Sequence, residues 1–327
     1  MAFLETVTGP LDEKLAGHCQ PHEHVYITQT PALLTNPELR LNNLAASIEE
    51  LKLYKKAGGD TLVDANPLAT GRDALALKSA SERSGVQIIA CTGYHIPVFY
   101  TKDHWIWSAA EADLEALFIK ELTEGMFLGG CYGWPVYQTD IKAGLVKAML
   151  TAEGVSGRTE TLLRAAGRAT AKTGTSLMLH TEYGKGALEA VRLLKEQGLD
   201  AERILICHVD RQAEDLTIHE KIAETGVFME YDTITLFEFH DNASEIRLLR
   251  HMISHGFLDQ LLLSTDPTAD RLKSYEGSCG MDYILTVFIP MLRDNGFTEE
   301  EIRKITRENP RRALSKSVEQ AHDESTG

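Results

Sequence analysis

The sequence lacks several features that would assign it to a broad class of proteins. No apolar run reaches the roughly 18 consecutive residues that a membrane-spanning helix needs. Its five cysteines are dispersed and form no Cys-x-x-Cys pair, which fits reduced thiols better than a disulfide framework. No Gly-x-Gly-x-x-Gly or P-loop motif follows the first predicted strand, which weakens a nucleotide-binding interpretation.

Basic residues are the scarcer charged type, with 33 Lys and Arg against 48 Asp and Glu and a net charge of −15. Such an acidic chain is a poor electrostatic match to nucleic acid or to an anionic membrane surface. Residues 1–18 are also acidic and have neither the basic nor the apolar region of a signal peptide. We therefore expect a cytoplasmic protein that binds neither nucleic acid nor membrane.

The chain does contain eight short apolar runs separated by helical patterns, several of which end in glycine. Strands that alternate with helices predict a parallel sheet, and eight such units predict a closed (β/α)₈ TIM barrel. We expect a single domain over residues 1–327, with an ordered core at about 15–315, a frayed tail at 316–327 and one helix at about 109–126 in an irregular segment, 96–142. The predicted strands are residues 22–27, 60–65, 87–95, 143–150, 176–182, 204–210, 227–233 and 261–266.

Potential metal ligands collect in these strands. His22 and His24 are two residues apart, so they point to the same side of a strand. In a (β/α)₈ barrel the carboxyl ends of all strands meet at one mouth, where active sites lie. The candidates on five different strands are His22, His24, Lys147, His180, His208 and Asp266.

Lys147 is the most informative of these residues because it lies within the apolar run AGLVKAML. A buried ammonium is unfavourable unless it is paired or loses its charge. A neutral lysine amine can react with CO₂ to form a carbamate, an anionic group that two metal ions can share. The lysine therefore favours a metal site that includes the histidines.

Each candidate also has a structural explanation when it is taken alone. A single histidine in an apolar run is more often a hydrogen-bonded core residue than a ligand, Lys147 could pair with a buried carboxylate, and Asp266 could cap a helix. Six such explanations at one end of one barrel are together improbable. We expect the other histidines to be solvated in loops or on helices, and Trp105 and Trp107 to pack the long loop. These histidines are His104, His219, His240, His251 and His255.

The ordered set of motifs resembles the phosphotriesterase-related branch of the amidohydrolase superfamily. The resemblance extends from residue 21 to about residue 314. It rests on PHEH (21–24), ACTGYH (90–95), IKAGLVK (141–147), LHTE (179–182), ICHVD (206–210), STD (264–266) and ENPRRAL (308–314).

The resemblance implies two divalent metal ions, with zinc expected and manganese, iron or cobalt as alternatives. It assigns His22, His24 and Asp266 to the more buried ion and His180 and His208 to the more exposed one. Lys147, carboxylated by CO₂, would bridge the two ions. A metal-bridging hydroxide would attack the substrate, and Asp266 would act as catalytic base. The resemblance also implies a homodimer.

The substrate is set by the loops. A stretch that reads GMDYILTVFIPML (280–292) is similar to lactonases of this family and favours a lactonase or carboxylic-ester hydrolase acting on a sugar-type lactone. An amidase or a phosphoester or phosphotriester hydrolase remains the alternative, and a non-catalytic barrel that binds a small molecule is a further one. The lysine that phosphorylated-lactone relatives carry after strand 7 is missing, which puts phosphate recognition in doubt. The predicted substrate contacts are Tyr94, Phe237, Arg271, Lys273 and Tyr275.

Overall fold

The computed structural model describes residues 2–317, which form a single domain around a parallel eight-stranded barrel. Its strands follow the order of the chain around the barrel, from β3 to β12. The number and order of strands confirm the predicted (β/α)₈ fold. The strands are β3 (His18–Glu23), β4 (Gly59–Asp64), β5 (Gln87–Gly93), β8 (Leu145–Met149), β9 (Ser176–His180), β10 (Ile204–Ile206), β11 (Phe228–Tyr231) and β12 (Leu261–Leu263).

The first barrel strand differs from the prediction, which placed it at residues 22–27. β3 begins at His18 and ends at Glu23, so His24 lies just past its end. The apolar residues that follow leave the barrel: the backbone N–H of Val25 donates to Asp64 Oδ2 at 2.8 Å, and the side chain packs in the outer core. The predicted run 22–27 therefore covers the end of β3 and the start of the loop that follows it.

The barrel closes between β12 and β3 through individual hydrogen bonds. The backbone N–H of His22 donates to Ser264 Oγ at 2.8 Å, and the N–H of Asp266 donates to the carbonyl oxygen of His22 at 3.2 Å. The second bond joins two predicted ligands, His22 and Asp266.

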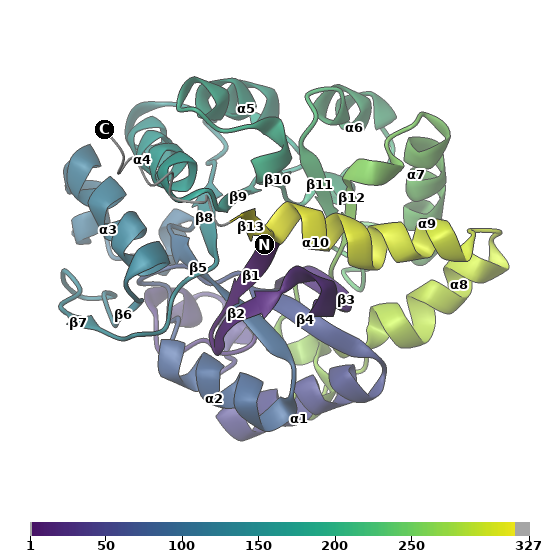
Figure 1. Ribbon diagram of the computed structural model, residues 1–327, viewed down its shortest axis with the longest axis horizontal. Coiled ribbons are helices and arrows are strands. Elements are labelled where there is room, and N and C mark those ends of the chain that lie inside the picture. The colour runs from purple at the N-terminus through teal and green to yellow at the C-terminus, as the bar shows by residue number, and fades with distance from the viewer. Residues whose placement is uncertain (1, 318–327) are drawn as a thin grey trace, which may run out of the picture.

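Helices surround the barrel, as Figure 1 shows in a view along its axis. No helix of the described residues 2–317 is long and apolar enough to cross a membrane. Three short C-terminal helices follow β12 and were not predicted individually. The helices are α1 (Leu44–Lys56), α2 (Ala74–Ser84), α3 (Glu111–Thr123), α4 (Gly157–Thr173), α5 (Ala187–Glu196), α6 (Leu216–Ala223), α7 (Asn242–Ser254), α8 (Ile289–Asp294), α9 (Glu299–Arg303) and α10 (Asn309–Leu314).

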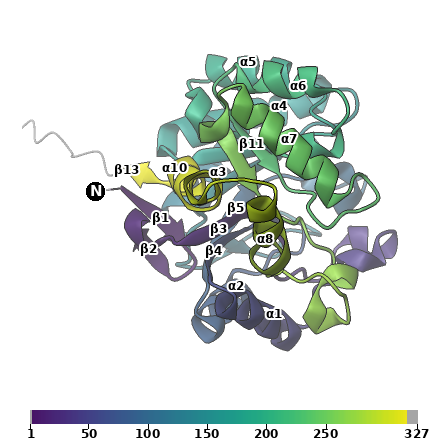
Figure 2. The same cartoon turned by 90° about the vertical axis from the view of Figure 1, so that its right-hand side faces the viewer.

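A small antiparallel sheet lies at one end of the barrel, as Figure 2 shows. It consists of β1 (Ala2–Thr6), β2 (Gly9–Asp12) and β13 (Lys316–Ser317), with β1 in the middle. The prediction of an ordered core at 15–315 was therefore too narrow at both ends. The rest of the predicted tail, residues 318–327, lies outside the described residues.

The core has two layers, which follow from the alternation of side chains along each strand. One set of strand residues packs outward against the helices, and the other fills the barrel. Leu4 of β1 and Leu314 of α10 join the inner set from the end where the small sheet lies. The inner strand residues are Cys19, Val63, Ile89, Cys91, Leu145, Met178, Leu205, Cys207, Phe228 and Leu262.

The irregular segment 96–142 is held by its aromatic residues. The indole N–H of Trp105 donates to the carbonyl oxygen of Gly130 at 2.8 Å, and that of Trp107 donates to Thr101 at 3.0 Å. These contacts agree with the expected packing role. The segment also contains α3, close to its predicted bounds, and the short strands β6 (Phe127–Leu128) and β7 (Tyr137–Gln138).

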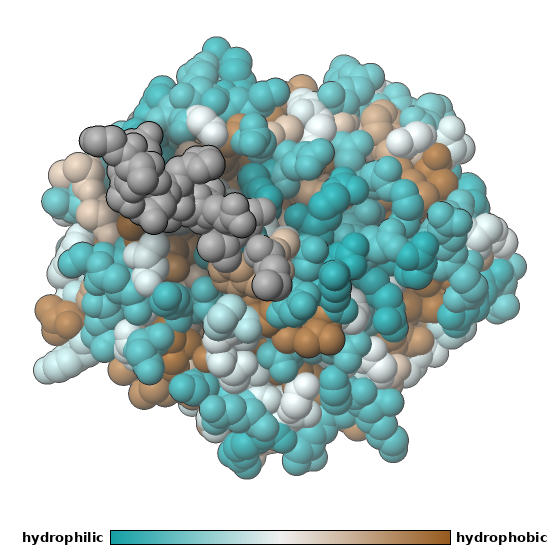
Figure 3. All heavy atoms as spheres, in the orientation of Figure 1, coloured by the Kyte–Doolittle hydropathy of each residue, from teal (hydrophilic) through white to brown (hydrophobic). Residues whose placement is uncertain are grey.

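The surface at the end with the small sheet is mostly hydrophilic. In Figure 3 its hydrophobic residues form small separate patches among polar ones.

Candidate metal centre

The predicted ligands meet at the carboxyl ends of the barrel strands. On β8, Leu145 fills the barrel, so Lys147 two residues later also points inward. His180 is the last residue of β9, two residues after the inward Met178. Because side chains alternate along a strand, Lys147 and His180 both point into the space at the carboxyl ends of the strands.

Two ligands reach this space through left-handed backbone. Cys207 fills the barrel, so regular alternation would turn His208 outward, but its φ of 60° redirects the chain. Asp266 has a φ of 42°. Such conformations are unfavourable for residues other than glycine and cluster at functional sites.

His22, His24 and Asp266 form one compact group. Asp266 Oδ1 lies 3.0 Å from His24 Nε2 and 3.6 Å from His22 Nε2. Ligands that share one ion at about 2.0–2.2 Å are about 3–3.5 Å apart, which these distances match. Burial alone would raise the pKa of Asp266, but the surrounding imidazoles outweigh it and hold that pKa well below its usual range.

His180 and His208 form a second group. His180 Nδ1 lies 2.9 Å from His208 Nε2, so two ring nitrogens face each other. Burial holds the pKa of both rings below its usual value, and it does so strongly for His208. Neutral imidazole is the form that binds metal.

Lys147 lies between these groups and is fully buried. Its Nζ is 3.1 Å from His22 Nε2, 3.1 Å from Met178 Sδ and 3.9 Å from Cys207 Sγ. None of the polar contacts of this amine within residues 2–317 is a carboxylate. An ammonium here would be surrounded by an imidazole and two sulfur atoms, which do not neutralise it.

A close backbone approach fixes the position of Lys147. Gly93 ends β5 with a φ of 103°, and a Cβ at this residue would lie 1.9 Å from the carbonyl oxygen of Lys147. The next residue, Tyr94, donates its N–H to the same oxygen at 2.9 Å. Only glycine allows β5 to pass β8 at this distance.

Two carboxylates that the sequence analysis missed orient the histidines. Asp232 contacts His208 Nδ1 at 2.8 Å and His22 Nδ1 at 2.9 Å, and Glu230 contacts His22 Nδ1 at 3.1 Å. Their partners are the Nδ1 atoms, so each Nε2 is directed into the centre. The signal was present in VFMEYDT, where two acidic residues alternate in an otherwise apolar strand.

A cavity of about 250 Å³ opens above the ligands. Of the predicted substrate contacts it includes Arg271, whose guanidinium donates to Thr235 Oγ1 at 3.0 Å and to backbone oxygens of Thr265 and Asp266. Arg211 also lines it and reaches Glu182 Oε2 at 3.1 Å and Asp266 Oδ2 at 3.4 Å. Further lining residues without a predicted role are His95, Ile96, Phe99, Leu236, Glu238 and Phe239.

The other four predicted substrate contacts lie outside this lining. The Tyr94 side chain turns into the outer core, where its hydroxyl donates to Met149 at 3.2 Å. Lys273 Nζ pairs with Asp282 at 2.6 Å, and Tyr275 bonds Ser47 Oγ at 2.8 Å. Phe237 is half exposed beside Tyr283. Sequence position alone could not give these directions, because each depends on the path of a loop.

Three histidines expected to be solvated are instead enclosed. His104 is bonded to Gly130, and His219 is fully buried against the hydroxyl of Tyr231 at 2.9 Å. The side chain of His240 is 5% exposed. The partners that bury these rings come from distant parts of the chain. His251 and His255 remain at least partly exposed, as expected.

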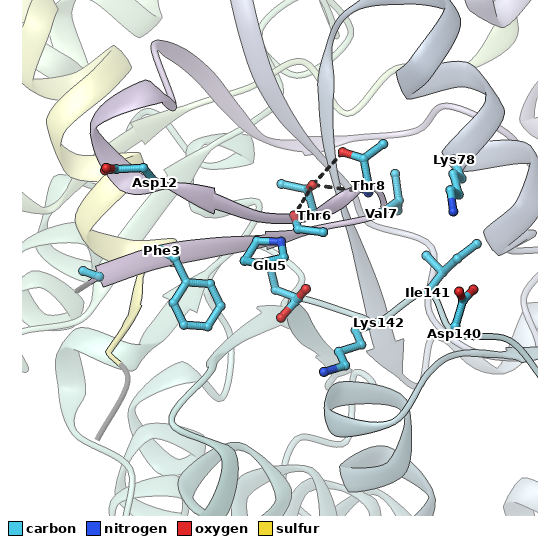
Figure 4. Close-up of a pocket in the computed structure, with 13 residues that line it drawn as sticks. Phe3, Glu5, Thr6, Val7, Thr8, Asp12, Lys78, Asp140, Ile141 and Lys142 are labelled. Atoms are coloured by element: carbon cyan, nitrogen blue, oxygen red, sulfur yellow. Dashed lines mark hydrogen bonds between the residues drawn. The ribbon is translucent and has the colours of Figure 1, made fainter. Parts of the chain in front are cut away.

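A larger cavity, of about 680 Å³, lies at the other end of the molecule, against β1 and β2. Figure 4 shows Lys78 and Lys142 at one side of it and Phe3 and Glu5 along the strand. All six predicted ligands lie elsewhere, so its size does not make it the better candidate for catalysis.

The profile of the Phosphotriesterase family matches residues 2–314. The chain belongs to the phosphotriesterase family. This assignment confirms the predicted resemblance and the predicted class, a metal-dependent hydrolase.

Individual relatives in the phosphotriesterase family differ in their named substrates. A phospho-furanose lactonase from Mycoplasmopsis synoviae is 28% identical, over 96% of this chain and 92% of that protein. An N-acetyltaurine hydrolase from Dictyostelium discoideum is 28% identical, over 85% of this chain and 75% of that protein. The crystal structure of a lactonase from Listeria monocytogenes superposes with a TM-score of 0.87 at 27% identity, covering 97% of this chain and 100% of that one.

Proposed function

We propose that this protein is a binuclear-metal hydrolase that opens a lactone of the sugar type or cleaves a carboxylic ester. The observation that carries the proposal is the environment of Lys147. Its amine is fully buried beside His22 and two sulfur atoms, with the other five predicted ligands at the same end of the barrel. A lysine in these surroundings is explained by conversion to a ligand.

Lys147 becomes a ligand by carboxylation. An unprotonated amine adds to CO₂, which forms an N–C bond and releases one proton. The resulting carbamate would be an anionic oxygen ligand for the ions. His22, His24 and Asp266 would hold one ion, and His180 and His208 the other, with zinc as the expected metal.

The ions, when bound, supply an activated water and polarise the carbonyl group of the substrate. The residues of the chain supply orientation and proton transfer. Asp232 fixes the rings of His22 and His208 through their Nδ1 atoms. Asp266 has a lowered pKa and is therefore ionised, as a base must be, and its Oδ2 would take the proton of the attacking water. The same atom can then protonate the oxygen that leaves when the ring opens.

The cavity favours a small substrate with an anionic group. Its volume of about 250 Å³ is below the usual range of about 300–1,000 Å³ for ligand sites. Arg211 and Arg271 line it, and the Nε of Arg211 is buried without a hydrogen-bond partner among residues 2–317. We therefore assign the anion to these arginines, and we keep Tyr94, Lys273, Tyr275 and Phe237 only as contacts that loop movement would have to bring in.

The two arginines also favour a second candidate, hydrolysis of an N-acyl amide that carries an acidic group. The name of the Dictyostelium relative describes such a substrate. The same centre would cleave an amide, because only the leaving group changes.

Location and assembly are further parts of the proposal. The acidic composition and dispersed cysteines support a cytoplasmic protein, and the family supports a homodimer. Tyr132, Val136 and Tyr137 are each more than 70% exposed and offer apolar surface for a second copy. Light scattering on the purified protein tests the dimer.

The experiment combines metal analysis with a substrate screen on one preparation. The screen contains sugar lactones with and without phosphate, aryl esters, acidic N-acyl amides and a phosphotriester. ¹³C-bicarbonate labelling with NMR reports the carbamate. Two metals, a carbamate signal and preference for a lactone support the proposal. Preference for an amide transfers the assignment to the second candidate, and a protein that takes up no metal with bicarbonate present contradicts both.

A further inference from the structure

A second group of potential ligands lies between β10 and α7 and has no part in the centre described above. We call it the Asp210 cluster; it consists of Asp210, His240 and Glu245. Asp210 lies in the short turn Val209–Arg211 after β10, His240 lies just before α7, and Glu245 is in the first turn of α7. The fold thus brings together two acids and an imidazole from two loops and a helix.

The carboxylates of the cluster are buried and largely without partners. Asp210 and Glu245 are both fully buried. Asp210 Oδ1 and both carboxylate oxygens of Glu245 have no hydrogen-bond partner among the described residues. Asp210 Oδ2 accepts from the N–H and the hydroxyl of Thr233, both at 2.7 Å. Three carboxylate oxygens therefore lack a hydrogen bond, although buried carboxylates normally have one, and one of the three, Glu245 Oε2, lies 3.3 Å from His240 Nε2.

The neighbouring Arg211 and His219 make their ion pairs and hydrogen bonds outside the cluster. Arg211 pairs with Glu182 and Asp266. His219 uses one ring nitrogen for the hydroxyl of Tyr231 and the other for the carbonyl oxygen of Gln212. His240 is thus the group left to face two buried carboxylates.

The pKa shifts in the cluster reflect two carboxylates buried close to one imidazole. Burial raises the pKa of Glu245 to about 8. Burial lowers the pKa of His240, but the carboxylates of Asp210 and Glu245 outweigh it and raise that pKa to about 9. A cation placed among the three groups would remove this unfavourable arrangement.

We propose that the Asp210 cluster binds a divalent cation of the zinc type, separate from the binuclear centre. One ligand atom of each residue lies within 4.8 Å of those of the other two, and His240 Nε2 lies 3.3 Å from Glu245 Oε2, within the spacing of about 3–3.5 Å for ligands of one zinc ion. One imidazole and two carboxylates suit zinc, manganese or cobalt. The hydroxyl of Thr233, 3.2 Å from His240 Nε2, lies beside the site and can hold a water in the fourth position.

Such an ion would tie the turn after β10 to the start of α7. Asp210 follows His208 by two residues, so the ion would also fix the backbone that carries one ligand of the catalytic centre. The cluster would therefore act as a positioning site, because it does not touch the substrate cavity.

The test uses Zn²⁺ alone as the probe. Protein stripped with a chelator is reloaded with Zn²⁺ and bicarbonate, and bound metal is counted by mass spectrometry. Glu245→Gln keeps the shape of the side chain and is expected to bind one fewer ion per chain than wild type. Glu220→Gln, in the partly exposed group with His251 and His255, is the matched control and is expected to bind as many ions as wild type.

Anomalous diffraction at the zinc edge on wild-type crystals tests the site without any variant. A peak between Asp210, His240 and Glu245 supports the proposal. No peak there, together with equal metal content in Glu245→Gln, overturns it and means that a proton on His240 holds the cluster. In Lys147→Ala the peak is expected to persist while those of the binuclear centre are lost, so failure of the catalytic proposal is distinguished from failure of this one.

Discussion

The two halves of the barrel interior bury opposite kinds of side chain. Toward the amino ends of the strands the interior contains Leu145, Phe228 and Leu262. Two residues further along the same strands it contains Lys147, Glu230 and Ser264, all fully buried. One strand thus supplies both a packed core and a reactive centre, and the change occurs within a single period of side-chain alternation.

The difference shows how the fold separates stability from chemistry. The apolar half gains free energy from burial and packing. The polar half loses free energy on desolvation, and its carboxylates show this: burial raises the pKa of Glu230 to about 8. The polar half therefore depends on the apolar half to keep its groups in place without bound metal.

The largest effect is expected from removing the lysine of the polar half. Lys147→Ala should lower kcat/KM by about 10³-fold or more and release both ions, because the bridging ligand is lost. Metal analysis and lactone hydrolysis measure this. Lys142→Ala, on the approach to the same strand, should leave both unchanged, and a Lys147→Ala protein that keeps two ions and full rate would remove the bridging role.

A slightly smaller effect, on the free energy of unfolding, is expected from a substitution in the apolar half. Phe228→Ala should lower the free energy of unfolding by about 3–5 kcal/mol through lost burial and a cavity. Phe228 is 1% exposed, whereas Phe237 is 53% exposed, so Phe237→Ala is the matched control and should change stability by less than about 1 kcal/mol. Urea denaturation of the metal-free proteins measures both, and equal losses would show that burial inside the barrel does not determine how much Phe228 contributes to stability.

The cavity above the metal ligands is expected to favour acidic substrates over uncharged ones. Arg211→Gln should lower kcat/KM for an acidic substrate by about 10–100-fold and affect an uncharged lactone less, because the guanidinium contributes a charge-assisted contact. Steady-state kinetics with the two substrates measure the ratio. Arg192→Gln, on the exposed face of α5, is the control. An equal loss for both substrates would instead indicate that Arg211 acts through Asp266.

The smallest effect is expected for Lys316, a buried lysine in β13 of the small sheet next to the apolar half. Burial, with a contribution from Lys142, lowers the pKa of Lys316 to about 8 despite Glu5. The unfolded chain then binds more protons between about pH 8 and 10.5, so wild-type stability should rise with pH in this window. Lys316→Met should remove that rise and add about 1–2 kcal/mol at neutral pH. Thermal melts across pH measure this. Lys14→Met, at an exposed lysine, should keep the rise.

The sequence was sufficient for the barrel and for the convergence of the six candidate residues at one end of it, because both depend on short-range periodicity. Apolar runs mark the strands, and a lysine within such a run has no good structural explanation. His22, His24 and Asp266 then follow from the convergence of strand ends. The comparisons confirm the family and its hydrolase class, while the roles of individual ligands remain predictions.

Other features depend on contacts between distant residues and could not be read from one sequence. Asp232 matters because its two oxygens face rings on two other strands. Tyr94 was predicted at the cavity but turns outward, since Gly93 already brings the backbone of β5 against β8. His240 was predicted to be solvated because the sequence does not show that α7 places Glu245 beside it.

The pairing of β1 with β13 has a consequence for the use of this protein. Ala2 lies opposite Ser317 in that sheet, so the first and last described strands are neighbours at the end of the barrel remote from the metal centre. A short peptide between these two strands could close the described part of the chain into a circle, and new ends could then be opened in a surface loop. An enzyme attached to a support through this small sheet would also present its metal-centre cavity to the solution.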